Sequence, residues 1–446
     1  MDTVLHGDIV TASKVVRDGY VGLSDGKVAF VGNALPSGAS NVIDHRGRLV
    51  FPGAVDAQVH SRSQKGREGF LYSTKAAAAG GVTTIVDMPY DEGLLVCSAA
   101  AVRQKAADVA HQAHVDVALY GTIKPEDGIA LIGEQVEAGV CAFKLSTFGT
   151  HPERFPRISP QLMFDTFAEV ARFGLPVGVH NENDEVVRAR TSAVKAEGRT
   201  DYLAHGLTHT PLSELLATAE IYEIGAASGC AAHVVHCSLG RGIEICETYK
   251  RQGFAASVEV CVHYLLFSED VEVRQKGGLA KINPPIRPSE ETEKLWSHLR
   301  AGNIDIVSTD HVAWSLDRKN DPNMLNNASG GPGLEALVPA LIRGCMDRGI
   351  DLSVAARLLA ANPARHFGLL SKGAIEVGKD ADFSIIDLEF APWPVSRSQT
   401  VSDWSLYDGM ELPQVRETWL RGRRIWDGNS VLNASGDGRF VKPFGR

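Results

Sequence analysis

Three histidines, one lysine and one aspartate stand where short apolar runs of the chain end. His60, His180 and His236 lie in or next to the last positions of such runs. Lys144 lies within another, and Asp310 follows the last one. Imidazole nitrogens and carboxylate oxygens suit Zn²⁺ or another divalent transition metal. If the runs end at one place, these side chains form a candidate metal site.

Each of these residues also has an ordinary structural interpretation. A single histidine at a strand end is more often a satisfied polar residue than a ligand, and Asp310-His311 could form a turn or a helix cap. Lys144 offers three donors and no acceptor, so its ammonium cannot bind a metal. It must be neutral, modified or a salt-bridge partner. The coincidence at five run ends favours a site.

The runs that carry these residues alternate with Ala-, Glu-, Lys- and Arg-rich stretches of helical spacing, as in repeated βα units around a parallel sheet. Eight units over roughly 300 residues predict a closed (β/α)₈ barrel, whose reactive groups lie at the carboxyl ends of the strands. The eight runs are 54–60, 82–88, 114–120, 142–147, 176–180, 233–237, 256–261 and 304–309.

The segments before and after the barrel are both predicted to form β-strands. Short β segments surround the turn Asp25-Gly26, and others follow residue 370. Neither flank is long enough for a robust core of its own. We therefore predict an α/β fold, a TIM-like (β/α)₈ barrel over residues 51–370, with a small composite β-sandwich domain built from residues 1–50 and 371–446.

Composition excludes several classes of protein. The 446 residues are 44% hydrophobic and 22% charged, an ordinary globular balance. Lys and Arg number 45 against 54 Asp and Glu, and without a basic stretch we expect no nucleic-acid partner. Without a leader or a long apolar window, we expect a cytoplasmic protein and no membrane partner. Seven scattered cysteines fit reduced thiols better than disulfides or a Cys-based zinc site.

An ordered set of short motifs covers nearly the whole chain and resembles one family, the cyclic amidohydrolases: dihydropyrimidinases or hydantoinases, allantoinases and dihydroorotases. The stretches 68–70 and 155–157 look most like allantoinases, and Gly149 replaces a tyrosine typical of hydantoinases. The family also implies a homo-oligomer, a tetramer or a dimer. The motifs are 51–53, 56–60, 68–70, 76–84, 87–89, 143–144, 179–183, 235–238, 259–264, 281–287, 309–311, 330–335, 362–364 and 372–382.

This resemblance implies a two-metal centre bridged by a carboxylated lysine, here Lys144. A CO₂-derived carbamate on Lys144 would turn a donor-only cation into an anionic ligand. His180 and His236 are implied on one metal, and a His-x-His pair with Asp310 on the other. The implied activity is hydrolysis of the C–N amide bond of a small cyclic amide, imide or ureide by metal-activated hydroxide, with Asp310 as the general base.

One position departs from the family pattern, because the first histidine of His-x-His is Gln58 here. An amide oxygen is a weaker zinc ligand than an imidazole nitrogen, so we expect one tightly held ion and a second that is weakly bound or absent. The expected metal is Zn²⁺, with Mn²⁺ as the alternative. In the competing interpretation Gln58 binds substrate. Arg62, placed like an arginine that holds substrate carboxylates in dihydroorotases, and Asn283 are further substrate-binding candidates, although Arg62 could equally be structural.

Two other functions stay open at this point. A lost ligand would permit a non-catalytic barrel that serves assembly or regulation, and the same metal centre could hydrolyse esters. Retention of His60, Lys144, His180, His236 and Asp310 favours an enzyme, because mutually repelling or desolvated groups at one site are costly without a function.

Overall fold

The computed structural model describes residues 1–64, 66–151 and 153–445. Its larger sheet has eight parallel strands hydrogen-bonded in chain order. A bridge between Val59 and His311 joins the last strand to the first, and the His60 amide donates to the His311 carbonyl oxygen at 2.8 Å. The predicted (β/α)₈ barrel is confirmed. Its strands are β5 (Ala54–Val59), β6 (Val82–Asp87), β9 (Asp116–Gly121), β10 (Ala142–Ser146), β11 (Pro176–His180), β12 (Ala231–Val234), β13 (Ala256–Cys261) and β14 (Ile306–Ser308).

The strands form where the sequence is apolar without alternation. Every residue of β5, β6, β9 and β10 is buried. Parallel strands covered on both faces have this composition, because each face contacts either the barrel interior or a helix. The polar residues that end these strands are therefore presented at one rim of the barrel.

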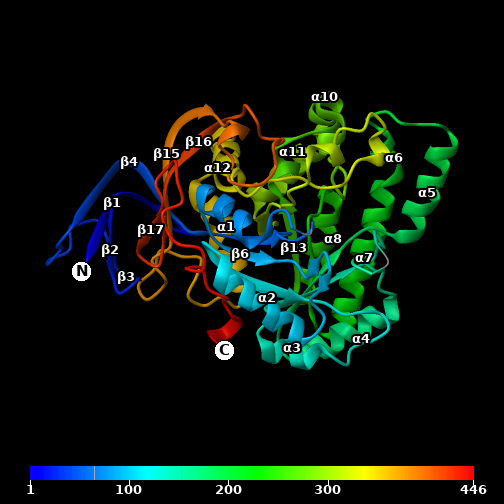
Figure 1. The fold of residues 1–446 in the computed structure, drawn as a ribbon, viewed down its shortest axis with the longest axis horizontal. Helices are drawn as coiled ribbons and strands as arrows, with labels where there is room; N and C mark the ends of the chain where they lie inside the picture. Colours follow the sequence, from blue (N-terminus) through cyan, green and yellow to red (C-terminus); the bar gives the residue numbers. More distant parts are fainter. Residues whose placement is uncertain (65, 152, 446) are drawn as a thin grey trace.

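Helices surround the barrel (Figure 1), and α5 (Asp184–Ala196) begins four residues after the end of β11. The Asn183 side chain accepts from the Val186 amide at 3.1 Å and so starts a helix three residues after His180. The helices are α1 (Gly69–Ala79), α2 (Ala99–Gln112), α3 (Ile132–Ala138), α4 (Pro160–Ala171), α5 (Asp184–Ala196), α6 (Ala204–Thr208), α7 (Pro211–Ser228), α8 (Gly240–Arg251), α9 (Val262–Leu266), α10 (Arg274–Lys276), α11 (Ser289–Ala301), α12 (Leu337–Asp347), α13 (Leu352–Ala356) and α14 (Asn362–His366). In the part of the chain that the structure describes, no helix combines the length and apolar character that a bilayer crossing needs.

A second sheet combines the two ends of the chain. Figure 1 shows its blue N-terminal strands beside its orange and red C-terminal strands. The antiparallel pair of β15 and β4 joins the two sets in one continuous sheet, and the exact division of the chain into two domains stays a prediction. In spatial order the strands are β17 (Arg423–Trp426), β16 (Glu411–Leu420), β15 (Phe383–Pro392), β4 (Val42–Pro52), β1 (Thr3–Val10), β2 (Val15–Ser24) and β3 (Lys27–Gly32). A separate two-stranded hairpin, β7 (Tyr90–Asp91) with β8 (Leu94–Leu95), follows β6.

A buried ion cluster fastens the small sheet to the barrel. The Lys372 ammonium lies 2.5 Å from Asp116 Oδ2, 2.9 Å from Asp380 Oδ2 and 2.9 Å from Asp382 Oδ2. Burial alone would lower the pKa of Lys372, but the three carboxylates raise it above its usual value. Because Asp116 begins β9, this cluster ties the amino-terminal rim of the barrel to the small sheet and leaves the opposite rim open.

Candidate active site

The carboxyl rim of the barrel carries the predicted site. Lys144 lies in β10 and His180 ends β11, whereas His236 and Asp310 follow β12 and β14 by two residues each. These residues line one cavity of about 340 Å³ together with Gln58, His60 and Asn283. Seven of the eight residues predicted for the site are thus brought together; the exception is Arg62.

His180, His236 and Lys144 form one half of the site. His180 Nδ1 and His236 Nε2 lie 2.9 Å apart. Burial lowers the pKa of His236 well below its usual value, with a further lowering from His180, so its imidazole is neutral and can serve as a ligand. Burial also lowers the pKa of Lys144 to about 8, against the opposing effect of Asp310. A partly neutral amine is the form that reacts with CO₂ to give a carbamate.

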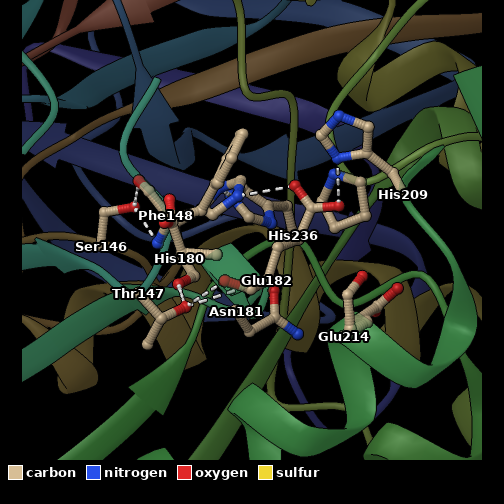
Figure 2. Close-up of polar contacts among 12 residues, drawn as sticks. Ser146, Thr147, Phe148, His180, Asn181, Glu182, His209, Glu214 and His236 are labelled. Atoms are coloured by element: carbon tan, nitrogen blue, oxygen red, sulfur yellow. Dashed lines mark hydrogen bonds and ion pairs between the residues drawn. The ribbon is translucent and has the colours of Figure 1, made fainter. Parts of the chain in front are cut away.

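A buried carboxylate orients the His180 ring. Figure 2 shows Glu182 between His180 and His209. Its two oxygens lie 2.8 Å from His180 Nε2 and 2.7 Å from His209 Nδ1. Burial would raise the pKa of Glu182, but the two histidines hold it well below its usual range. With its Nε2 held by the carboxylate, His180 presents Nδ1 toward His236, as metal-binding histidines are usually oriented.

The His236 segment has its own support. His236 has a φ of 41°, a conformation that costs free energy unless its surroundings hold it. Two residues later the Ser238 amide and hydroxyl donate to the Glu214 carboxylate at 2.7 and 2.5 Å. Arg287 donates to Glu214, to Ser238 Oγ and to the His209 carbonyl oxygen. One buried polar network therefore supports both histidines of this half.

Gln58, His60 and Asp310 form the other half. Gln58 Nε2 donates to Asp310 Oδ1 at 2.8 Å, and His60 Nε2 lies 3.2 Å from the same oxygen. Burial would raise the pKa of Asp310, but His60 holds it at about 2, so the carboxylate is an anion at neutral pH. Gln58 Oε1 is buried and has no hydrogen-bond partner among the described residues.

The two halves fit a metal ion differently. Within the described residues, no group of three or more His, Cys, Asp and Glu side chains converges to hold an ion unaided. The first half has two imidazole nitrogens 2.9 Å apart, and a carbamate on Lys144 would complete the set. In the second half an amide N–H, which cannot bind a cation, is directed at the aspartate oxygen. The residues therefore fit one ion at His180 and His236.

Arg62 differs from the other predicted site residues because it is not among the residues that line the cavity, and its substrate-binding role stays a prediction. Its Nη1 lies 2.5 Å from Asp108 Oδ2, and its Nε lies 3.3 Å from Asp91 Oδ2. Two carboxylates thus engage the guanidinium, and Arg62 is absent from the residues that line the cavity. Asn283 does line it, and its Oδ1 is buried without a partner among the described residues, so its substrate-binding role stays a prediction.

His311, next to Asp310, is a structural residue. Its Nε2 lies 3.1 Å from both carboxylate oxygens of Glu68, and its Nδ1 accepts from the Gly333 amide. Glu68, whose motif suggested allantoinases, also accepts from the Thr400 hydroxyl. Glu68 therefore links the start of α1 to His311 and Thr400.

Sequence reasoning missed several residues of the cavity wall. Arg154, Trp314 and Arg318 line the cavity from the segments that follow β10 and β14. Arg154 directly precedes Phe155, in a stretch whose likeness to allantoinases was noted for family rather than for chemistry. Its position after the lysine strand was the available signal.

Comparison with known proteins extends this geometry to a family. The sequence profile described as "Amidohydrolase family" matches residues 49–423. The chain belongs to this amidohydrolase family. It is similar to an allantoinase from Rubrobacter xylanophilus, with 38% identity over 98% of this chain and 97% of the relative. It is 32% identical to a D-hydantoinase from Ralstonia pickettii, over 99% of each chain.

A solved structure gives the same assignment. The L-hydantoinase (dihydropyrimidinase) from Arthrobacter aurescens matches with a TM-score of 0.94 and 28% identity over 99% of each chain. The amidohydrolase described here is accordingly a metal-dependent hydrolase that acts on the C–N bond of a cyclic amide. Members of the family generally depend on divalent metals and carry a carboxylated lysine. The comparisons give no support to a non-catalytic barrel.

Proposed function

We propose that this amidohydrolase opens the ring of a cyclic ureide of the allantoin or hydantoin type, with one tightly held divalent ion. The observation that carries the proposal is the convergence of Lys144, His180, His236 and Asp310 on one cavity in a chain that matches allantoinases over nearly its whole length. A volume of about 340 Å³ suits a small ring with a substituent.

Asp310 is the proposed proton shuttle. Its carboxylate is anionic; Gln58 donates to one of its oxygens, and His60 Nε2 lies 3.2 Å from the same oxygen. The other oxygen can accept a proton from water as the water attacks the ring carbonyl, and can return that proton to the leaving nitrogen. Asn283 is proposed to hold the substrate, because its buried side-chain oxygen can accept from a ring N–H.

The metal belongs to the half of the site that contains His180, His236 and carbamate-modified Lys144. A bound divalent ion supplies Lewis acidity there, which lowers the pKa of water and polarises the carbonyl. We propose Zn²⁺, with Mn²⁺ as the alternative, since imidazole ligands suit zinc. Gln58 holds Asp310 in place as a base and disfavours a second ion beside it.

A turnover screen tests this function. The purified protein, with its metal content measured, is assayed on allantoin, hydantoin, dihydrouracil and dihydroorotate, with aryl esters in parallel. We expect opening of allantoin or a hydantoin and weak or no ester hydrolysis. Esterase activity without ring opening would contradict the proposal.

Three further properties complete the proposal. We propose a homo-oligomer, a cytoplasmic location, and a division into a barrel of residues 51–370 and a composite β domain of residues 1–50 and 371–446. Light scattering tests the first, cell fractionation the second, and limited proteolysis near residues 50 and 371 the third.

A further inference from the structure

Arg154 lines the cavity with a charged group that has no carboxylate at ion-pair distance among the described residues, although Asp91 and Glu92 act on its charge from farther away. Among the described residues no ion pair joins its guanidinium to an acid, in contrast to Arg62. Arg154 Nε is buried and has no hydrogen-bond partner among the described residues. Arg154 as a whole is half-buried, but a buried N–H donor without an acceptor costs free energy, which a ligand that brings an oxygen acceptor would recover.

Contacts on its other sides hold Arg154 in place. Its Nη2 donates to the Tyr90 carbonyl oxygen at 3.1 Å, and its guanidinium carbon lies 5.4 Å from the centre of the Phe155 ring. Phe155 packs on Tyr90 with ring centroids 4.1 Å apart, and the Tyr90 hydroxyl donates to the Lys144 carbonyl oxygen at 3.1 Å. The arginine is thus braced against the strand that carries the site lysine.

We infer that Arg154 is a specificity-determining residue that binds an oxygen acceptor, a carboxylate or a ureido carbonyl, on the substituent of the substrate ring. This inference rests on the proposed function and narrows the substrate to rings that carry such a group. A guanidinium fork is suited to carboxylates and planar carbonyls, and a lysine at the same place would keep the charge but lose the paired donors.

The test compares three rings and three variants. The rings are allantoin with its ureido group, a hydantoin with a carboxymethyl group at C5, and a hydantoin with an isopropyl group at C5. The variants are Arg154→Met, Arg154→Lys and the control Arg157→Met, which removes the same charge from an exposed arginine of the same segment that does not line the cavity.

Arg154→Met should reduce kcat/KM by about 10- to 100-fold for one or both acceptor-bearing rings and by less than about threefold for the isopropyl ring, mainly through KM. Arg154→Lys should recover part of the loss, and Arg157→Met should change none of the three. The acceptor-bearing ring with the larger loss of kcat/KM shows whether Arg154 prefers a ureido carbonyl or a carboxylate. Equal losses on all three rings would overturn the inference.

Failure of the proposed function can be distinguished from failure of the inference about Arg154. If the unmodified protein opens none of the three rings, the proposed function fails, and the dissociation constants of the same compounds, measured by calorimetry on the same metal-loaded protein, test Arg154 alone. A selective loss of affinity for acceptor-bearing rings in Arg154→Met would still support the inference, and equal affinities would overturn it.

Discussion

The two halves of the site are built differently, although both lie on one rim of the barrel. In the half of His180 and His236, two ring nitrogens face each other, and buried carboxylates hold the surrounding segments. In the half of His60 and Asp310, the amide of Gln58 satisfies the carboxylate directly. Under the proposed function the first half binds a cation and the second holds a base, so Gln58 would separate two functions that a symmetric two-metal site would share.

Replacing Lys144 should have the largest effect, because it removes metal binding from the half of His180 and His236. Lys144→Ala removes the group that would complete the ligand set of the first half, so metal content and turnover should both be lost. Metal analysis and a turnover assay on the folded variant measure this. A short carboxylic acid in the buffer should partly restore activity, and an active variant without added acid would show that Lys144 is not a ligand.

Replacing Asp310 should affect the second half alone. Asp310→Asn keeps the size but removes the base, so kcat should fall by about 10² or more while the ion at His180 and His236 stays bound. Steady-state kinetics with metal analysis separate the two effects. Near-normal turnover at full metal content would exclude Asp310 from the mechanism.

Replacing Glu182 should weaken the first half without touching the substrate. Glu182→Gln removes the charge that fixes the His180 ring, so metal affinity should fall by about 10- to 100-fold. Competition with a chromogenic chelator measures it. The control is Glu185→Gln, an exposed residue in the first turn of α5. Unchanged affinity in Glu182→Gln would mean that Glu182 does not position the ligand.

Replacing Gln58 should make the two halves of the site more alike in metal affinity. In Gln58→His an imidazole replaces the amide that donates to Asp310, so affinity for a second ion should rise by about tenfold or more. Metal titration tests this, and turnover of several rings is measured in parallel. A changed substrate preference without a change in metal binding would support the competing interpretation, that Gln58 binds substrate.

The barrel could be predicted because buried parallel strands are continuous apolar runs, which can be counted in order along the sequence. Strand ends were less certain. The run 233–237 includes three residues beyond the end of β12 at Val234, because the chain turns at His236, with its positive φ. The cavity residues His60, Lys144, His180, His236 and Asp310 could be picked out because they stand in or next to the ends of the apolar runs.

The surroundings of the site could not be predicted in the same way. Arg62 has a suggestive spacing from His60, but its partner Asp108 lies 46 residues away on α2 and is brought to it by the fold. Glu182 was in a recognised motif, yet its contact with His209 depends on the packing of segments 27 residues apart. Spacing identifies residue types near a site, whereas the fold decides which partner each obtains.

Metal stoichiometry of the unmodified protein tests the difference between the halves most directly. The purified chain is dialysed exhaustively, its metal content is measured, and the same metal is then titrated back. We predict one ion per chain that resists dialysis and a second that binds about 100-fold more weakly or not at all. Two equally tight ions per chain would contradict the account.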